Sequence, residues 1–188
     1  MPYLSPEQVI DIATRGQFDE LKGAIEDHQI EAKAEPYADT PLGRLELAKD
    51  ICGLANAGGG VIIIGARTER LEAQQQDAIR EVRPFVQALV NTEQYQAIIR
   101  VGVFPPPQGL EIHWYQSAIQ TDRGILLIIV PKQPDEERPF LMARVVDVET
   151  GRLREIVFGY AERRRSNTEP LGVRDLQELL RAGRASVR

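Results

Sequence analysis

The stretch from Thr40 to Gly65 constrains the fold more than any other part of the sequence. Thr40-Pro41 is a helix-start signal, because threonine caps free N–H groups and proline suits the first helical position. Residues 42–56 then place apolar side chains over about half of a helix circumference and leave a narrow polar stripe of Glu46, Lys49 and Asp50. Three glycines end this helix, and residues 61–64 are the apolar run of a central strand. The sequence therefore predicts a mostly buried helix packed on a sheet.

The flanking segments extend this prediction. Ser5-Pro6 predicts a helix that runs to about Gly16, and the alternating residues 29–34 predict a strand. We also expect a helix over 72–90, a strand over 97–104 and mainly strands after residue 110. These elements predict an α+β fold, a mixed β-sheet with packed helices. The length of 188 residues fits one domain, which we place at residues 20–182, with an N-terminal helical extension at 1–19 and a tail at 183–188.

Composition removes several classes of protein. No stretch approaches the roughly 20 apolar residues that span a bilayer, and the first residues lack the pattern of a secretory signal, so we expect no membrane partner and a cytoplasmic location. Cys52 is the only cysteine, and His28 and His113 are the only histidines, which excludes an internal disulfide and gives no zinc-site spacing. No pattern of nucleophile and base is present, and Cys52 lies on the apolar side of its helix.

The charge is uneven along the chain. The whole chain has a net charge of -5, but residues 138–188 carry 11 arginines, no lysine and 7 acidic residues. Arginine suits phosphate because its planar guanidinium is weakly hydrated and always charged. Within this region, three arginines and three small hydrogen-bonding residues follow one another: Arg163, Arg164, Arg165, Ser166, Asn167 and Thr168. Such residues are typical contacts to phosphate and sugar, although an ordinary charged loop would show the same pattern.

Two further patterns concern ligands. Gly58, Gly59 and Gly60 follow a helix, whereas phosphate loops precede one, so we interpret them as a helix end. Glu26 and Glu31 lie on either side of a turn, with Lys33 beside Glu31, and convergent carboxylates are the ligands that divalent ions require. This spacing suits a metal site at Glu26 and Glu31, for Mg or Mn, but the abundance of acidic residues in the chain favours the alternative, a solvated polar face.

Several of these segments occur in the order of a known family. Glu26, Glu31-Ala32-Lys33, the run Ala55-Asn56-Ala57-Gly58-Gly59-Gly60 and the strand that ends at Gly65 resemble the Schlafen AlbA-type domain. The segments Val130-Pro131, Arg138-Pro139 and 158–168 are similar to later parts of its pattern, so the resemblance covers about residues 20–182. Asn56, Gly58, Gly59, Gly60 and Gly65 correspond to its structural motif.

This resemblance implies nucleic-acid binding and, in some members, metal-dependent endoribonuclease activity on structured RNA. Glu26, Glu31 and Lys33 match the family's catalytic positions. The third family carboxylate, an Asp just after the strand glycine, is absent here, and Glu69 is only close to that position. An incomplete carboxylate set leaves the question of enzymatic activity open.

Three functions follow as hypotheses. The first is binding of RNA or DNA through its backbone by residues 163–168, with Lys33 assisting. The second is a metal-dependent endoribonuclease that uses Glu26, Glu31 and Lys33. The third is a protein-interaction module that binds no nucleic acid. A homodimer also stays open.

Overall fold

The computed structural model describes residues 3–71, 76–142, 144–146, 153–155, 161–164 and 167–170, and positions 178, 180 and 181. The helices are α1 (Pro6–Arg15), α2 (Pro41–Ala57) and α3 (Thr92–Gly102), with short 3-10 turns η1 (Phe18–Leu21), η2 (Gln87–Leu89) and η3 (Asp135–Glu137). Within the described residues no helix combines the length and apolar character that crossing a membrane requires. The fold is α+β, as predicted.

The central element is a four-stranded sheet in the order β1-β2-β7-β6. Its strands are β1 (Ile30–Lys33), β2 (Gly60–Ile64), β6 (Glu111–Gln116) and β7 (Gly124–Val130). β1 runs parallel to β2, and the other neighbours are antiparallel, so the sheet is mixed. β2 is buried at every position, which explains its continuous apolar sequence.

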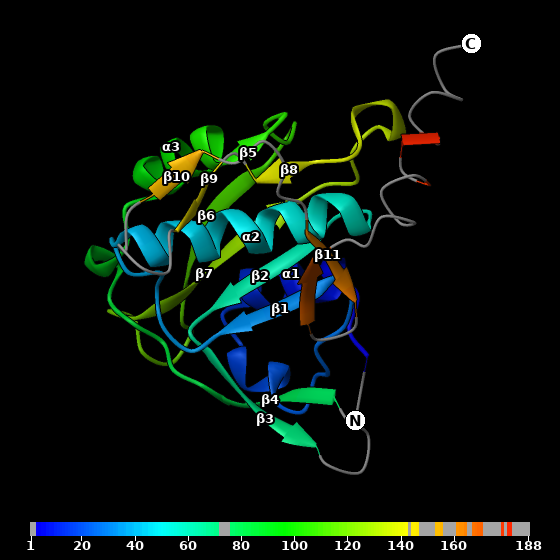
Figure 1. The fold of residues 1–188 in the computed structure, drawn as a ribbon. Coiled ribbons are helices and arrows are strands. Elements are labelled where there is room, and N and C mark those ends of the chain that lie inside the picture. Colours follow the sequence, from blue (N-terminus) through cyan, green and yellow to red (C-terminus); the bar gives the residue numbers. More distant parts are fainter. Residues whose placement is uncertain are drawn as a thin grey trace.

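Helices cover both faces of this sheet (Figure 1). Because side chains alternate along a strand, Ile62 and Ile64 pack with α2 and α3, whereas Val61 and Ile63 pack with α1 and η1. α1 buries Val9, Ile12 and Ala13 in this second cluster. The boundary that we place at residue 19 stays a prediction.

The remaining strands form two-stranded pairs. These are β3 (Ala66–Leu71) with β4 (Gln76–Val82), β5 (Val103–Phe104) with β8 (Leu141–Met142), β9 (Arg144–Val146) with β10 (Leu153–Glu155), and β11 (Ala161–Arg164) with β12 (Asn167–Pro170). The β3–β4 hairpin lies at the bottom of Figure 1, away from α2.

Two of the predicted elements are wrong. Residues 76–82 form strand β4 rather than a helix, because this segment pairs with β3 along one side and bonds to residues 23–26 along the other. Of the strand predicted over 97–104, residues 97–102 belong to helix α3 instead, and residues 103–104 form the short strand β5. The Asn91 side chain caps this helix by accepting a hydrogen bond from Gln94 N, and the buried residues Tyr95 and Ile99 are four positions apart.

Candidate functional site

Glu31 and Lys33 lie on one face of β1, two residues apart, and Lys33 also contacts α2. The Lys33 ammonium is 2.8 Å from Glu31 Oε1 and 2.9 Å from Asp50 Oδ2, so a single cation joins two carboxylates from different elements. Glu31 is 7% exposed and Asp50 2%, whereas 28% of the Lys33 side chain is exposed. We call Glu31, Lys33 and Asp50 the β1–α2 charge cluster. The cluster links β1, at the edge of the sheet, to helix α2 through the ion pair between Lys33 and Asp50.

Tyr37 lies beside this cluster. Its hydroxyl donates a 2.7 Å hydrogen bond to Asp50 Oδ2, and the centre of its ring is 5.8 Å from Lys33 Nζ. Burial raises the pKa of the Tyr37 phenol well above its usual value, and the nearby Asp50 carboxylate adds to this effect. The tyrosine therefore stays a neutral donor to Asp50. Its ring packs edge-on against Tyr95.

Glu26 has a different environment. It is 4% exposed, and its Oε1 accepts a 2.6 Å hydrogen bond from Ala32 N. The carbonyl of Gln29 accepts from Val61 in β2, and the carbonyl of Lys33 accepts from Gly65 just after β2. The Ala32 N–H therefore points to the opposite side of β1, where the described residues place no further strand of this sheet. Glu26 thus accepts a hydrogen bond from a backbone N–H group on the outer edge of β1. The catalytic role that the resemblance implies for Glu26 stays a prediction.

The arrangement of these side chains does not fit a divalent ion. The position between Glu31 and Asp50 that such an ion would take holds the Lys33 ammonium. Among the described residues, no group of three or more His, Cys, Asp and Glu side chains is placed to hold a metal ion. Mg²⁺ and Ca²⁺ require several oxygen ligands at once. We therefore derive no chemistry from a metal at Glu26 and Glu31.

The glycine run has a structural role at the end of α2. Gly58 has a φ of 105° and donates its N–H to Leu54 O, which is a helix C-cap. A Cβ atom at Gly59 would lie 2.7 Å from both Val130 O and Lys132 N, so only glycine allows the chain to pass β7 at this distance. Gly65, with a φ of 102°, then turns the chain from β2 into β3.

Asn56, just before these glycines, joins α2 to a distant segment. Its Nδ2 donates to Phe140 O at 2.9 Å, and its Oδ1 accepts from Phe140 N at 2.8 Å. Both residues are buried. The Asn56 side-chain amide therefore bonds to both the N–H and the C=O of Phe140, as the backbone of a neighbouring strand would. These two bonds position the chain just after Arg138-Pro139.

Four of the predicted nucleic-acid contacts lie on the β11–β12 hairpin. Arg163 is opposite Thr168 in the antiparallel register, and Arg164 is opposite Asn167. Arg165 and Ser166 lie outside the described residues. β11 packs against α2, near the end of the helix that leads into β2 (Figure 1). The hairpin and the charge cluster thus share α2 as their support.

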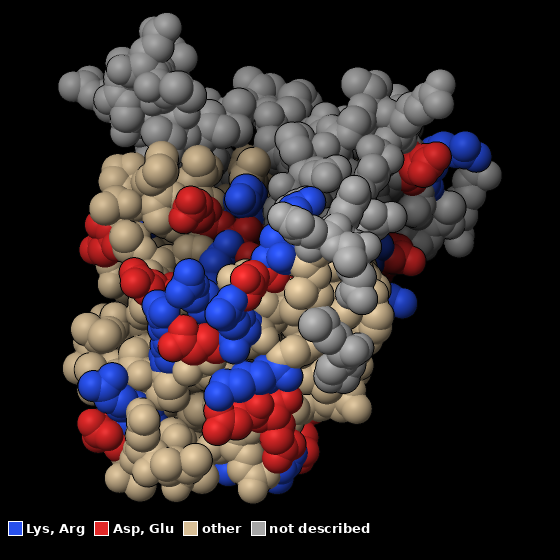
Figure 2. Space-filling view, turned by 90° about the horizontal axis from the view of Figure 1, so that it is seen from below, with Lys and Arg blue, Asp and Glu red and all other residues tan. Residues whose placement is uncertain are grey.

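A second arginine-bearing surface is electrically mixed. Figure 2 views the molecule from the side of the β3–β4 hairpin, and lysines and arginines alternate there with acidic residues. Arg80 pairs with Glu69, and Arg83 with Glu81. The hydrogen bond from Arg83 lowers the pKa of the Glu81 carboxyl. Because these charges compensate one another, this face is a poor candidate for contact with phosphate.

Asp50 is a member of the site that the sequence patterns did not predict. Its spacing along α2 predicts a place on a polar stripe, but Asp50 is among the least exposed polar residues described. A signal was available, because a carboxylate within a mostly buried helix requires a cationic partner, and Lys33 lies on the adjacent strand. Glu69 lies on β3 in an exposed ion pair with Arg80 and does not join the cluster.

Known proteins show only a distant structural similarity to this chain. No protein-family model and no curated protein matches the sequence. A solved structure of the N-terminal domain of a RecG-related protein from Nitrosomonas europaea is similar, at 16% identity and a TM-score of 0.44, over 86% of this chain and 93% of that domain. A likeness at this level does not assign a function to this chain.

Proposed function

We propose that this protein binds the phosphate backbone of RNA or DNA through the β11–β12 hairpin. The observation that carries the proposal is the register of the hairpin, which sets Arg163 and Arg164 opposite Thr168 and Asn167. Guanidinium groups neutralise phosphate, and hydroxyl and amide groups hydrogen-bond to phosphate and sugar oxygens. A short ribbon that carries both kinds of side chain can follow a backbone without reading bases.

The charge distribution supports the same proposal. The region from residue 138 onward is cationic although the whole chain is acidic. Such an asymmetry attracts a polyanion to one end of the molecule and repels it from the rest. The resemblance of residues 20–182 to Schlafen AlbA-type domains agrees with this function.

Lys33 has a smaller part in this proposal. Two carboxylates already share its ammonium, which weakens its attraction for phosphate. An ammonium has three donors, and the partly exposed side chain leaves room for a contact with an incoming ligand oxygen. We therefore expect the hairpin arginines to dominate affinity.

The test is fluorescence anisotropy with labelled tRNA, single-stranded RNA and duplex DNA over a series of salt concentrations. Binding should weaken steeply with salt, and the Arg163→Gln/Arg164→Gln variant should reduce the slope of log K against log salt on DNA by about 2, because each contact contributes about 0.9. The matched control is Arg80→Gln/Arg83→Gln, which removes two arginines from the mixed-charge face. It should bind as the wild type does.

Other outcomes of this experiment would replace the proposal. Equal binding by the hairpin variant and the wild type would show that the hairpin is not the contact. Cleavage of tRNA in Mn²⁺ that EDTA and Glu31→Gln both abolish would favour the endoribonuclease hypothesis. The absence of any binding at low salt would leave protein recognition as the better hypothesis.

A further inference from the structure

The β1–α2 charge cluster contains two buried carboxylates that converge on one point. Glu31 Oε1 and Asp50 Oδ2 each lie within 2.9 Å of Lys33 Nζ. Buried carboxylates this close together repel each other unless a cation lies between them. In many proteins that cation is a divalent ion, whereas here it is a side chain of the same strand.

We propose that Lys33 is the resident counter-ion of this carboxylate pair and takes the place of a divalent cation. The pair then takes up a divalent ion only when the ammonium is removed. Asp50, which α2 supplies, is the positioning residue that holds the ammonium over the sheet. The proposal does not depend on nucleic-acid binding.

Covalent attachment favours the ammonium over a free ion. Lys33 is two residues from Glu31 on the same strand, so its effective concentration at the carboxylates greatly exceeds that of a dissolved metal. The Tyr37 ring lies 5.8 Å from Nζ and adds a cation–π attraction. The Tyr37 hydroxyl also bonds to the Asp50 oxygen that Lys33 contacts, so a metal would have to displace two donors from that oxygen.

Lys49 provides a matched control. Its ammonium is 3.8 Å from Asp50 Oδ1, and 40% of its side chain is exposed. Lys49 thus carries the same charge beside the same carboxylate, but it contacts Asp50 alone in the described structure. Removing Lys49 changes the net charge as removing Lys33 does, without opening the position between the carboxylates.

The experiment is a titration of Mn²⁺ alone, with free Mn²⁺ followed by electron paramagnetic resonance, for the wild type, Lys33→Met and Lys49→Met. Lys33→Met should bind one Mn²⁺ at least about tenfold more tightly than the wild type, because the position between the two carboxylates no longer holds a cation. Lys49→Met should behave as the wild type does. Adding Asp50→Asn to Lys33→Met should abolish the gained binding.

Two results would overturn the proposal. Equal Mn²⁺ affinity of the wild type and Lys33→Met would show that the ammonium does not compete with a metal. A wild-type melting temperature that rises in millimolar Mn²⁺ would show that the native cluster already binds one. This second measurement needs no variant, so the proposal stays testable if Lys33→Met fails to fold, and Lys33→Gln offers a polar replacement.

Discussion

Replacing Asn56 by alanine tests how much of the fold depends on the contact between α2 and Phe140. The substitution removes the donor to Phe140 O and the acceptor for Phe140 N. Phe140 is fully buried, so water cannot replace the lost partner of its N–H group. Its carbonyl oxygen keeps a contact with Cys52 Sγ at 2.9 Å. One buried backbone donor is therefore left unsatisfied, and one acceptor is weakened.

The expected loss follows from these contacts. A net hydrogen bond contributes about 1 kcal/mol, and an unsatisfied buried donor costs about 1–3 kcal/mol, so Asn56→Ala should reduce the free energy of unfolding by about 3 kcal/mol. For a chain of this length each kcal/mol lowers the melting temperature by about 2–4 °C, which gives a drop of about 6–12 °C. Asn56→Asp should be at least as damaging, because it places a carboxylate oxygen against Phe140 O.

Urea unfolding followed by circular dichroism measures this loss, with thermal unfolding as a second readout. The control is Asn91→Ala, which removes an exposed asparagine that caps α3 and should cost about 1 kcal/mol. If Asn56→Ala is no more destabilising than Asn91→Ala, the amide does not hold Phe140, and the reasoning from buried hydrogen bonds is wrong.

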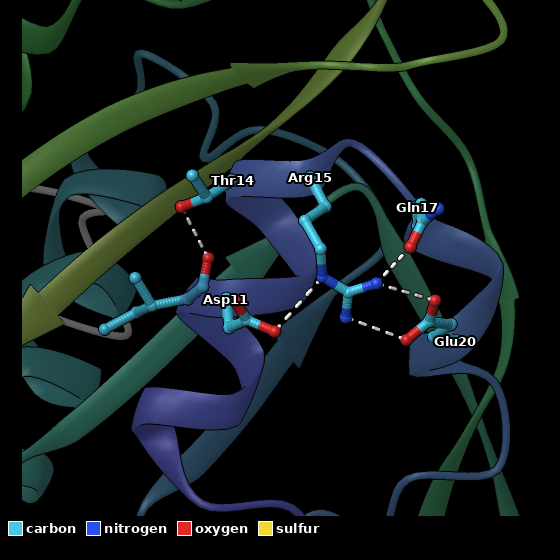
Figure 3. A network of polar contacts seen from close by, with 6 residues as sticks. Asp11, Thr14, Arg15, Gln17 and Glu20 are labelled. Atoms are coloured by element: carbon cyan, nitrogen blue, oxygen red, sulfur yellow. Dashed lines mark hydrogen bonds and ion pairs between the residues drawn. The ribbon is translucent and has the colours of Figure 1, made fainter.

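Four more substitutions test other features of the structure. Gly16→Ala should reduce the free energy of unfolding in urea by more than about 2 kcal/mol, because its Cβ would lie 2.6 Å from a backbone nitrogen and its φ is 66°. Gly23→Ala should reduce it by only about 1 kcal/mol, because Gly23 has a φ of 83° but no atom within 4 Å of the added Cβ. The hydrogen bond from Arg15 holds the pKa of the Glu20 carboxyl below its ordinary value of 4.5 (Figure 3). The ion pair therefore stabilises the folded protein above pH 4.5, and this stabilisation is lost as the pH falls through the lower pKa of the folded state. Glu20→Gln should thus make the urea midpoint depend less on pH in acid. An unchanged pH dependence would contradict the ion pair with Arg15. Tyr37→Phe should reduce the free energy of unfolding by about 1 kcal/mol, because it removes the hydroxyl that donates to a buried carboxylate of α2. In an ultraviolet titration it should also remove a tyrosine whose pKa lies well above the usual value.

Elements with strong local signals were predictable from the sequence. Ser5 forms the capping box that its sequence indicates, and Thr40-Pro41 begins α2. β4 was not predictable, because its residues favour a helix and only pairing on both sides makes it a strand. At the end of α3 the β-branched residues favour a strand, so a strand was predicted where the chain is helical, although Asn91 is a typical residue for a helix N-cap.

The charge cluster was only half predictable. Alternation along β1 placed Glu31 and Lys33 on one face, as the structure has them. Their convergence with Asp50 depends on how α2 crosses the sheet, which the sequence of α2 does not encode by itself. Glu26 was predictable as a neighbour of β1, but its bond to Ala32 N depends on the position of β1 at the edge of the sheet that the described residues form.

That bond has a consequence for how the molecule behaves in a crowded solution. An open strand edge offers unpaired N–H groups to any other chain, and this is how sheets grow into aggregates. At β1 the Glu26 carboxylate takes the place that a carbonyl oxygen of an incoming strand would fill. A buried acid beside an edge strand thus also protects the folded protein against strand addition, and sequences that lose it should aggregate more readily even where binding is unaffected.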